Sequence, residues 1–484
     1  MRSNAPSQRK HQKLPSLTLG AAALFAVVSL AACPKPQPAH TSAGPGGDGN
    51  DGSKPKTRFS PTWDLKVFKV NGIQVVHKNT PKKPVVSLRV YFNGGSGNLT
   101  EKTAGVEELL LSTMEMGGSK SYPMDKLSTT LSRTGIQLQA AAGQDYSVLA
   151  IKTTTRHFDT AWSILSDLIM NPALDAMALK VQRRRQLKAI QTRFDSPDSQ
   201  ISVVSEKFFF AGHPYSHLQM GTEANVKRFT VDDLEAHHKK LLNPEKMVVV
   251  AVGDLDRSDL ERKIQKAMGA LKARPGARAQ AKPFPSAPEK KANRVKLVAR
   301  ALRTNYVLGY FNAPAPGHPD YAATRIATAF LSDELFETLR TKKHLVYAIS
   351  SGISVRRANI GYIYLSTKKP NAAVEAALAK IKGLAAEGVS QQELDEMRSV
   401  FVTKRLLKLQ TQGAQARLLG RAHLTAGDAN WAERSLVEMR NVSTADVSRM
   451  LDKYVKNIQF VLVGPAKVDS KAFRSGEPVV DPTE

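Results

Sequence analysis

Apolar and polar positions follow one another in an order that occurs twice along the chain. The first series opens with an apolar strand at 85–92 and closes with another at 247–253. Between them, apolar residues recur at helical spacing over about 103–115, 157–168 and 175–193. These patterns predict one unit in which strands and helices are mixed.

The second series repeats this order. It opens with a strand at 305–311 and closes with one at 458–464, and its helical stretches are 319–331, 371–386 and 390–409. Two series of matching order and similar length indicate a duplicated unit. We therefore predict an α+β fold of two homologous halves, each a mostly antiparallel sheet packed with helices, which form a clam-shell.

A stretch rich in Pro, Ala, Lys and Arg separates the two series. It is typical of a linker, which we place at 271–294. The N-terminal domain is predicted to span 59–270 and the C-terminal domain 295–468, with a tail at 469–484.

The first residues have the layout of an export signal at 1–32, with basic residues first and an apolar run after them. The run ends Leu-Ala-Ala-Cys at Cys33, which resembles the lipobox of bacterial lipoproteins, where the chain is cut before a lipidated cysteine. The alternative, a membrane-spanning anchor, is disfavoured because the run is short and Pro15 interrupts its start. Polar residues at 33–58 predict a flexible tether. We expect a periplasm-facing lipoprotein of the bacterial envelope, and Pro34 after the cysteine favours the outer membrane.

Composition narrows the class of protein. Hydrophobic residues make up 42% and charged residues 23% of the 484, which is typical of a globular protein. The net charge is +27, but the basic residues are not interleaved with aromatic ones, which disfavours nucleic acid. A solvated basic surface, anionic lipid or an acidic partner fits better. The single cysteine excludes an intrachain disulfide.

Short motifs between residues 208 and 254 carry a family resemblance. They include His213-Pro214-Tyr215, Asn243-Pro244-Glu245 and Val252-Gly253-Asp254. In type and order they resemble the pitrilysin/insulinase-like metallopeptidase family, which includes the mitochondrial processing peptidase. The likeness covers about 61–465.

Active members of that family carry a His-x-x-Glu-His helix that binds zinc and activates its water. The matching positions here are Glu108, Leu111 and Ser112. A glutamate from a later helix completes the family's site, and it falls here near Lys188 or Ala189. The resemblance therefore implies a degenerate motif, no catalytic residue and no metal in this chain, with zinc expected only in a partner subunit.

Other histidines offer little for a metal site. His213 and His217 lie four residues apart, but Pro214 argues against a helix there, and His237 and His238 are adjacent. We interpret all of them as loop and surface histidines.

The second half keeps one family feature. In relatives, an arginine and a tyrosine seven residues later reach the substrate and help to stabilise the tetrahedral intermediate. Arg340 and Tyr347 match that spacing, so the resemblance implies substrate binding by these two residues. The alternative is structural: Arg340 ends a helix and Tyr347 packs in a strand.

These features favour a non-catalytic partner subunit of a zinc-bearing peptidase of the same family, which helps to bind a peptide or an unfolded protein. A second hypothesis is a lipid-anchored scaffold without a peptidase role, which captures peptides along the edge strand at about 137–141. A third, an active peptidase with an unrelated site, is disfavoured because no Gly-x-Ser-x-Gly motif occurs.

Overall fold

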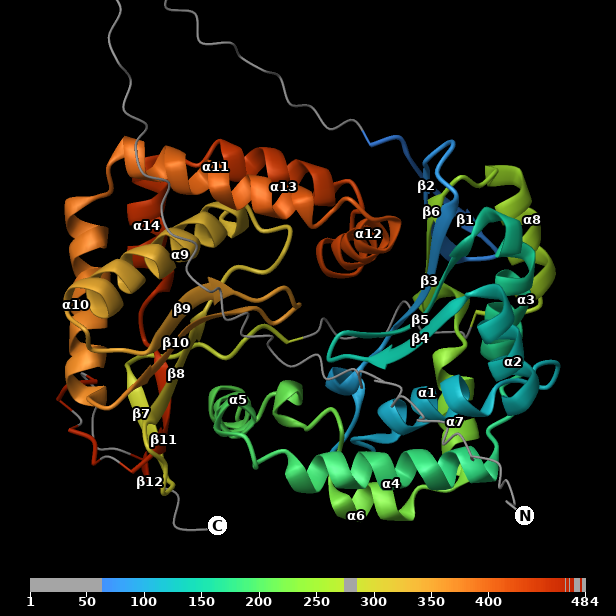
Figure 1. Cartoon of the computed structure of the whole chain (residues 1–484), viewed down its shortest axis with the longest axis horizontal. Coiled ribbons are helices and arrows are strands. Elements are labelled where there is room, and N and C mark those ends of the chain that lie inside the picture. The colour runs from blue at the N-terminus through green and yellow to red at the C-terminus, as the bar shows by residue number, and fades with distance from the viewer. Residues whose placement is uncertain (1–62, 274–284, 466, 470, 474–478, 481–484) are drawn as a thin grey trace, which may run out of the picture. The chain divides into compact units, whose positions relative to one another are not determined.

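The computed structural model describes residues 63–273 and 285–465, together with 467–469, 471–473 and 479–480 (Figure 1). The predicted signal peptide, Cys33, the tether and the middle of the predicted linker lie outside the described residues. Among the residues described, no helix combines the length and the apolar character needed to cross a bilayer.

The first half is built on a mixed sheet with the strand order β1-β2-β6-β3-β5-β4. Its strands are β1 (Leu65–Val70), β2 (Ile73–Asn79), β3 (Val85–Asn93), β4 (Gln137–Ala142), β5 (Tyr146–Thr154) and β6 (Met247–Gly253). β2 and β6 run parallel, and the other neighbouring strands run antiparallel. Every residue of β6 is buried, because this Val-rich strand lies in the interior of the sheet.

The second half repeats this arrangement with the order β12-β7-β11-β8-β10-β9. Its strands are β7 (Arg294–Ala299), β8 (Asn305–Asn312), β9 (Ala348–Ile353), β10 (Ile360–Thr367), β11 (Gln459–Gly464) and β12 (Val479–Val480). β7 runs parallel to β11 and β12, and the remaining pairs are antiparallel. β11 therefore takes the place of β6, and β9 takes the place of the edge strand β4.

The first half contributes a series of helices, several of which cover one face of its sheet. They are α1 (Val106–Gly117), α2 (Met124–Thr134), α3 (Phe158–Met170), α4 (Ala176–Thr192), α5 (Pro197–Phe209), α6 (Glu223–Arg228), α7 (Val231–Leu241) and α8 (Arg257–Met268). α1 packs beside β4, α3 against β5 and α8 against β1. α7 begins with a capping box, in which Thr230 and Asp233 satisfy each other's backbone amides.

The helices of the second half follow in the corresponding order. They are α9 (Tyr321–Leu335), the π-helical segment η5 (Phe336–Lys342), α10 (Pro370–Glu387), α11 (Gln391–Leu407), α12 (Gln412–Ala426), α13 (Trp431–Arg440) and α14 (Thr444–Tyr454). α14 begins with the same capping box as α7, formed here by Ser443 and Asp446. By chain order and contacts, α9 corresponds to α1, α11 to α4 and α12 to α5.

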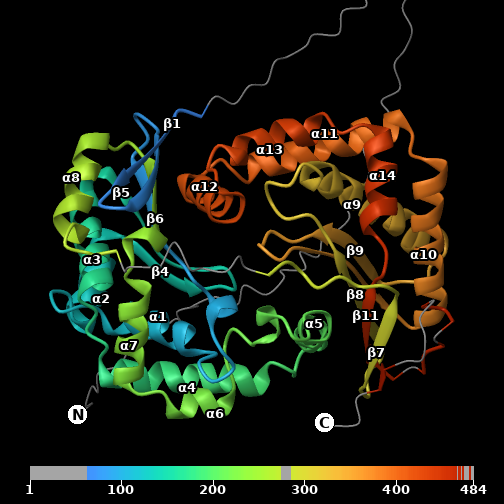
Figure 2. The ribbon, with the colours of Figure 1, turned by 180° about the vertical axis from the view of Figure 1, so that it is seen from behind.

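Each half lends one helix to the sheet of the other. α5 of the first half packs on β8 and β11, while α12 of the second half packs on β3 and β6, the corresponding strands (Figures 1 and 2). The contact of α12 is close, since a Cβ on Gly420 would lie 2.2 Å from the Tyr91 ring. Two of the hydrophobic cores therefore contain side chains from both halves. Each half depends on a helix of the other half to cover its sheet.

The turns of two corresponding hairpins also meet. Arg357, between β9 and β10, donates from Nε to Oδ1 of Asp145, between β4 and β5, at 2.9 Å. Its neighbour Arg356 donates from Nη1 to Gln144 Oε1 at 2.7 Å and to Glu206 Oε1 on α5 at 2.8 Å. Arg356 is buried, so its charge depends on these partners.

The predicted α+β fold of two homologous halves, with mostly antiparallel sheets, is confirmed. The helix predicted at 103–115 is α1, which begins later because Gly105 holds a left-handed conformation, with φ of 95°, at its N-cap. The sequence patterns did not single out α5 or α12, the two exchanged helices.

Candidate functional site

The positions that match the family's zinc helix lie on the first turns of α1 and do not form a ligand set. Leu111 is 1% exposed and belongs to the apolar core of the first half. Ser112 donates from Oγ to the Leu109 carbonyl of its own helix at 3.1 Å. Glu108 accepts a hydrogen bond of 3.4 Å from Gln219 Nε2. One carboxylate, one hydroxyl and one alkyl side chain cannot hold a tetrahedral zinc ion.

Two carboxyl groups of α1 are held in a poorly solvated place beside β4. Burial raises the pKa of Glu108, and the neighbouring Glu107 adds to this rise. Burial also raises the pKa of Glu115, two helical turns further on, to about 7, although the backbone of Ala140 opposes the rise. Because burial penalises their charged forms, both groups bind protons more readily than an exposed glutamate.

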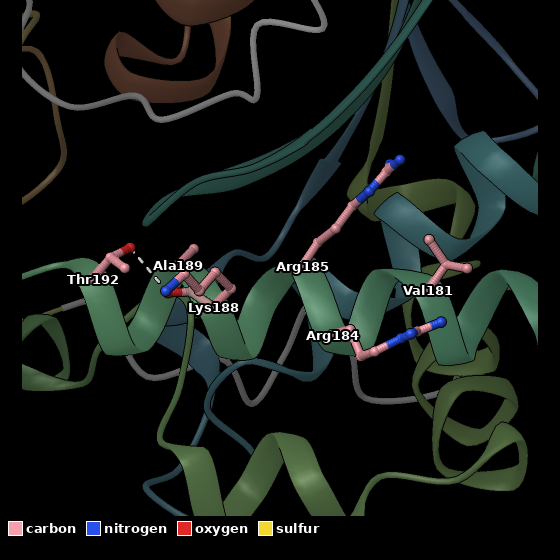
Figure 3. A pocket seen from close by; sticks show the side chains of 6 residues that line it. All are labelled: Val181, Arg184, Arg185, Lys188, Ala189 and Thr192. Atoms are coloured by element: carbon pink, nitrogen blue, oxygen red, sulfur yellow. Dashed lines mark hydrogen bonds between the residues drawn. The ribbon is translucent and has the colours of Figure 1, made fainter.

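The helix that carries the family's third zinc ligand is basic here. Lys188 and Ala189 lie on α4, where they line an open hollow of about 600 Å³ together with Arg184 and Arg185 (Figure 3). Arg185 points away from the helix on one side and Arg184 extends along the other. The exposed arginine and lysine side chains at this place would repel a zinc ion, so the residues present do not fit zinc.

Hydrogen bonds nevertheless hold α4 in place against α1. Gln186 is buried, and its Nε2 donates to the Gly105 carbonyl at 3.1 Å and to the Met220 carbonyl at 2.9 Å. These bonds fasten α4 to the start of α1, which α4 also contacts. In the described part of the chain, no group of three or more His, Cys, Asp or Glu side chains is placed to hold a metal ion.

A buried carboxylate that the sequence did not single out organises this end of α1. Glu107 accepts hydrogen bonds from the Gly95 amide at 3.0 Å and from the Ser147 hydroxyl, and its Oε2 lies 3.0 Å from His237 Nε2 on α7. The hydroxyl contacts the carboxylate rather than the imidazole, so this is not the arrangement that activates a serine. Glu107 instead ties β5, α7 and the loop before α1 together.

The interpretation of the histidines needs correction. His213 is 6% exposed and His238 is 9% exposed, so neither is a surface histidine. His213 Nδ1 accepts from the Tyr215 amide at 3.0 Å, and His238 Nε2 lies 2.8 Å from the Ile169 carbonyl. Burial lowers the pKa of both. They are inside because backbone groups satisfy their ring nitrogens.

Arg340 and Tyr347 lie on one well-anchored turn. Arg340 lies in the last turn of the π-helical segment η5, is exposed, and donates from Nη1 to the Val346 carbonyl at 3.0 Å. Tyr347 is 51% exposed, while its amide donates to the Ser366 carbonyl at 2.8 Å. Buried Leu339 and Val346 hold the turn to the core. Both polar side chains are therefore presented outward, and among the described residues no hydrogen bond or ion pair links them to α1 or α4.

Comparison with protein families agrees with this duplicated architecture. Residues 74–212 match the model of insulinase, peptidase family M16, and residues 228–401 match the model described as the peptidase M16 inactive domain. Together these matches cover well over half of the sequence. The chain belongs to the insulinase family.

Relatives of this chain are named either as zinc proteases or as non-peptidase homologues. A protein of Bacillus subtilis named uncharacterized zinc protease YmxG is 21% identical, over 82% of this chain and 97% of that protein. The non-peptidase homolog YmxG of Helicobacter pylori is 22% identical, over 82% of this chain and 93% of its own. The crystal structure of a peptidase M16 inactive domain from Pseudomonas fluorescens superposes with a TM-score of 0.75 at 20% identity, over 84% of this chain and 99% of that one.

Within the insulinase family, this chain differs at the positions of the zinc motif. It has the fold of the family and lacks the residues that bind zinc at Glu108, Leu111 and Ser112. Sequence reasoning located these losses, because they fall within a motif of fixed spacing. It missed Glu107, whose only signal was a second glutamate in an otherwise leucine-rich helix.

Proposed function

We propose that this protein is a non-catalytic partner subunit of an insulinase-family peptidase that carries an intact His-x-x-Glu-His helix. In this pair, the partner supplies the zinc and the chemistry, and this chain helps to bind the peptide or unfolded substrate. A lipid on Cys33 anchors it to the bacterial envelope, facing the periplasm, with the outer membrane favoured.

The observation that carries the proposal is an asymmetry between the halves. Every position needed for zinc in the first half holds another residue type, while Arg340 and Tyr347 stay exposed on a turn fixed by Leu339 and Val346. Ordered, exposed guanidinium and phenol groups are the donors that hold a peptide backbone or a developing oxyanion. Purely structural roles would not require the side chains of Arg340 and Tyr347 to face solvent.

The edge strand β4 supports binding of an extended peptide. Within the described residues, β4 pairs with β5 alone and ends the first sheet. An extended chain can add to such an edge through main-chain hydrogen bonds. Its Ala140–Ala142 segment has short side chains, which leaves room for those of a bound peptide.

Tagged purification from the native envelope tests the proposal. We expect a second insulinase-family chain in the eluate, with chelator-sensitive peptidase activity that falls at least tenfold in Arg340→Ala and Tyr347→Phe. Lys342→Ala, an exposed change on the same turn, is the matched control and should keep the activity. An eluate without a peptidase partner that still binds unfolded protein would instead favour the lipid-anchored scaffold.

Anchoring is tested separately. Cys33→Ser should move the protein from the membrane fraction to the soluble periplasmic fraction, because the lipidated thiol is lost. Fractionation of inner and outer membranes then decides between the two locations. If Cys33→Ser stays with the membrane, the proposed lipid anchor is wrong.

A further inference from the structure

Three arginines from three helices of the second half come together without an acidic residue among them. Arg325 lies on α9, Arg405 on α11 and Arg421 on α12, and we call them the arginine cluster. The positive charges of Arg325 and Arg421 both act on Arg405. Burial, followed by these charges, lowers the pKa of the Arg405 guanidinium to about 10.

The partners of the arginine cluster leave much of its hydrogen-bonding capacity unused. Arg325 Nη1 donates to the Ile353 carbonyl at 3.2 Å, and Arg421 Nη2 donates to the Val355 carbonyl at 3.1 Å. The Nε atoms of all three arginines are buried without a hydrogen-bond partner. Among the described residues, none of the three forms an ion pair with a carboxylate. The three side chains are partly buried, and like charges held together there without counter-ions are unfavourable, so the cluster is not explained by stability.

The place of the arginine cluster in the fold is also informative. α9 and α11 are the counterparts of α1 and α4, the two helices that hold the degenerate zinc positions in the first half. Arg405 lies near the end of α11, much as Ala189 lies near the end of α4. Ile353 ends β9, the counterpart of the edge strand β4. The arginine cluster therefore lies at the place in the second half that corresponds to the degenerate zinc positions of the first half.

The positive charge continues from the arginine cluster toward the first sheet. Arg421, Arg89 on β3 and Arg417 on α12 all act on the Tyr146 hydroxyl, and the Nε of Arg89 is also buried without a partner. Asp145, a carboxylate that also acts on Tyr146, is paired with Arg357. Around Tyr146, the arginines of the described chain that act on it therefore outnumber the carboxylates that do.

We propose that the arginine cluster binds carboxylates of an acidic peptide segment. This inference rests on the proposed peptide-binding function and narrows its substrate to chains rich in Asp or Glu. A peptide carboxylate supplies the charge and the two oxygens that a guanidinium fork accepts. A peptide is the suitable bearer of that group because the cluster lies at the end of the edge strand β9, where extended chains can pair.

Binding of two matched peptides to the purified full-length protein tests this inference. One fluorescein-labelled decapeptide carries three Glu residues, and the other has Gln in their place. We expect the wild type to bind the Glu peptide at least tenfold more tightly, with a preference that weakens as salt rises. Arg405→Gln should remove most of this preference. Arg434→Gln is the matched control, because it removes one positive charge from an exposed arginine paired with Asp428. This variant should retain the wild-type preference for the Glu peptide.

Further measurements make each outcome decisive. Arg405→Gln should unfold at the same or a higher temperature than the wild type, because it relieves repulsion between like charges, so lost binding would not reflect misfolding. Equal binding of both peptides would overturn the acidic preference and leave peptide binding standing. Failure of both peptides to bind would overturn the acidic preference and the proposed peptide-binding function together. Competition by inorganic phosphate at concentrations that match those of the peptide would identify a free phosphate, rather than a peptide, as the occupant.

Discussion

Arg357 and Asp145, on the turns of two corresponding hairpins, form an ion pair of 2.9 Å between Nε and Oδ1. Asp145 is 6% exposed at its side chain and also accepts from the Tyr215 hydroxyl and from the Arg357 amide. The duplicated halves therefore meet at equivalent places, and their contact is polar at the hairpins and apolar at the exchanged helices. This mutual dependence predicts that the halves unfold together.

The hairpin contact predicts a measurable loss of stability. Arg357→Gln leaves the Asp145 carboxylate short of its cation, so the free energy of unfolding should fall by about 2 kcal/mol. Urea denaturation measures this, with the exposed arginine change Arg434→Gln as control, which should cost below about 1 kcal/mol. Equal effects of the two changes would contradict the inferred role of the pair.

The packing of α12 on the first sheet predicts that Gly420 accepts no side chain. Gly420→Ala places a Cβ 2.2 Å from the Tyr91 ring, which should lower the free energy of unfolding by about 1–3 kcal/mol. Gly383→Ala on α10 is the matched control. Its Cβ meets only one atom, at 3.9 Å, so this change should be neutral or stabilise by up to about 1 kcal/mol. Tyr91→Leu should restore part of the loss in Gly420→Ala, and a failure to do so would place the strain elsewhere.

Burial of Glu115 predicts a pH dependence of stability. Its pKa of about 7 in the folded chain exceeds that of an unfolded glutamate, so the folded state binds the proton more tightly. Stability should therefore fall as pH rises from about 4.5 to about 7 and stay level above this range. Glu115→Gln should reduce the loss of unfolding free energy between these pH values by roughly 1–3 kcal/mol. The exposed change Glu235→Gln should retain the wild-type loss, and an unchanged slope in Glu115→Gln would show that another group is responsible.

The retained geometry of α1 and α4 predicts that a zinc site can be rebuilt. Glu108→His with Ser112→His places two imidazoles on one face of α1, and Ala189→Glu adds a carboxylate from α4. The triple variant should bind about one zinc ion per chain, at least tenfold more tightly than the variant with the two histidines alone. Metal analysis after dialysis measures the stoichiometry. Equal zinc affinity in both variants would mean that α4 does not approach α1 as family members require.

Sequence alone determined the duplicated order of strands and helices, because apolar periodicity reports which face of each element is buried. It also located the loss of the zinc positions at Glu108, Leu111 and Ser112, since a ligand motif has fixed spacing on one helix. It could not assign His213 and His238 to the interior, because their burial depends on the carbonyl and amide groups that satisfy their rings.

Only the tertiary structure decided which half each helix serves. Nothing in the amphipathic pattern of α5 or α12 states that its apolar face covers the sheet of the other half. The arginine cluster likewise unites residues 325, 405 and 421, which have no common motif and whose proximity follows from the packing of three helices. Local periodicity specifies elements and faces, whereas the pairing of faces distant in sequence is set by the shape and charge of the assembled chain.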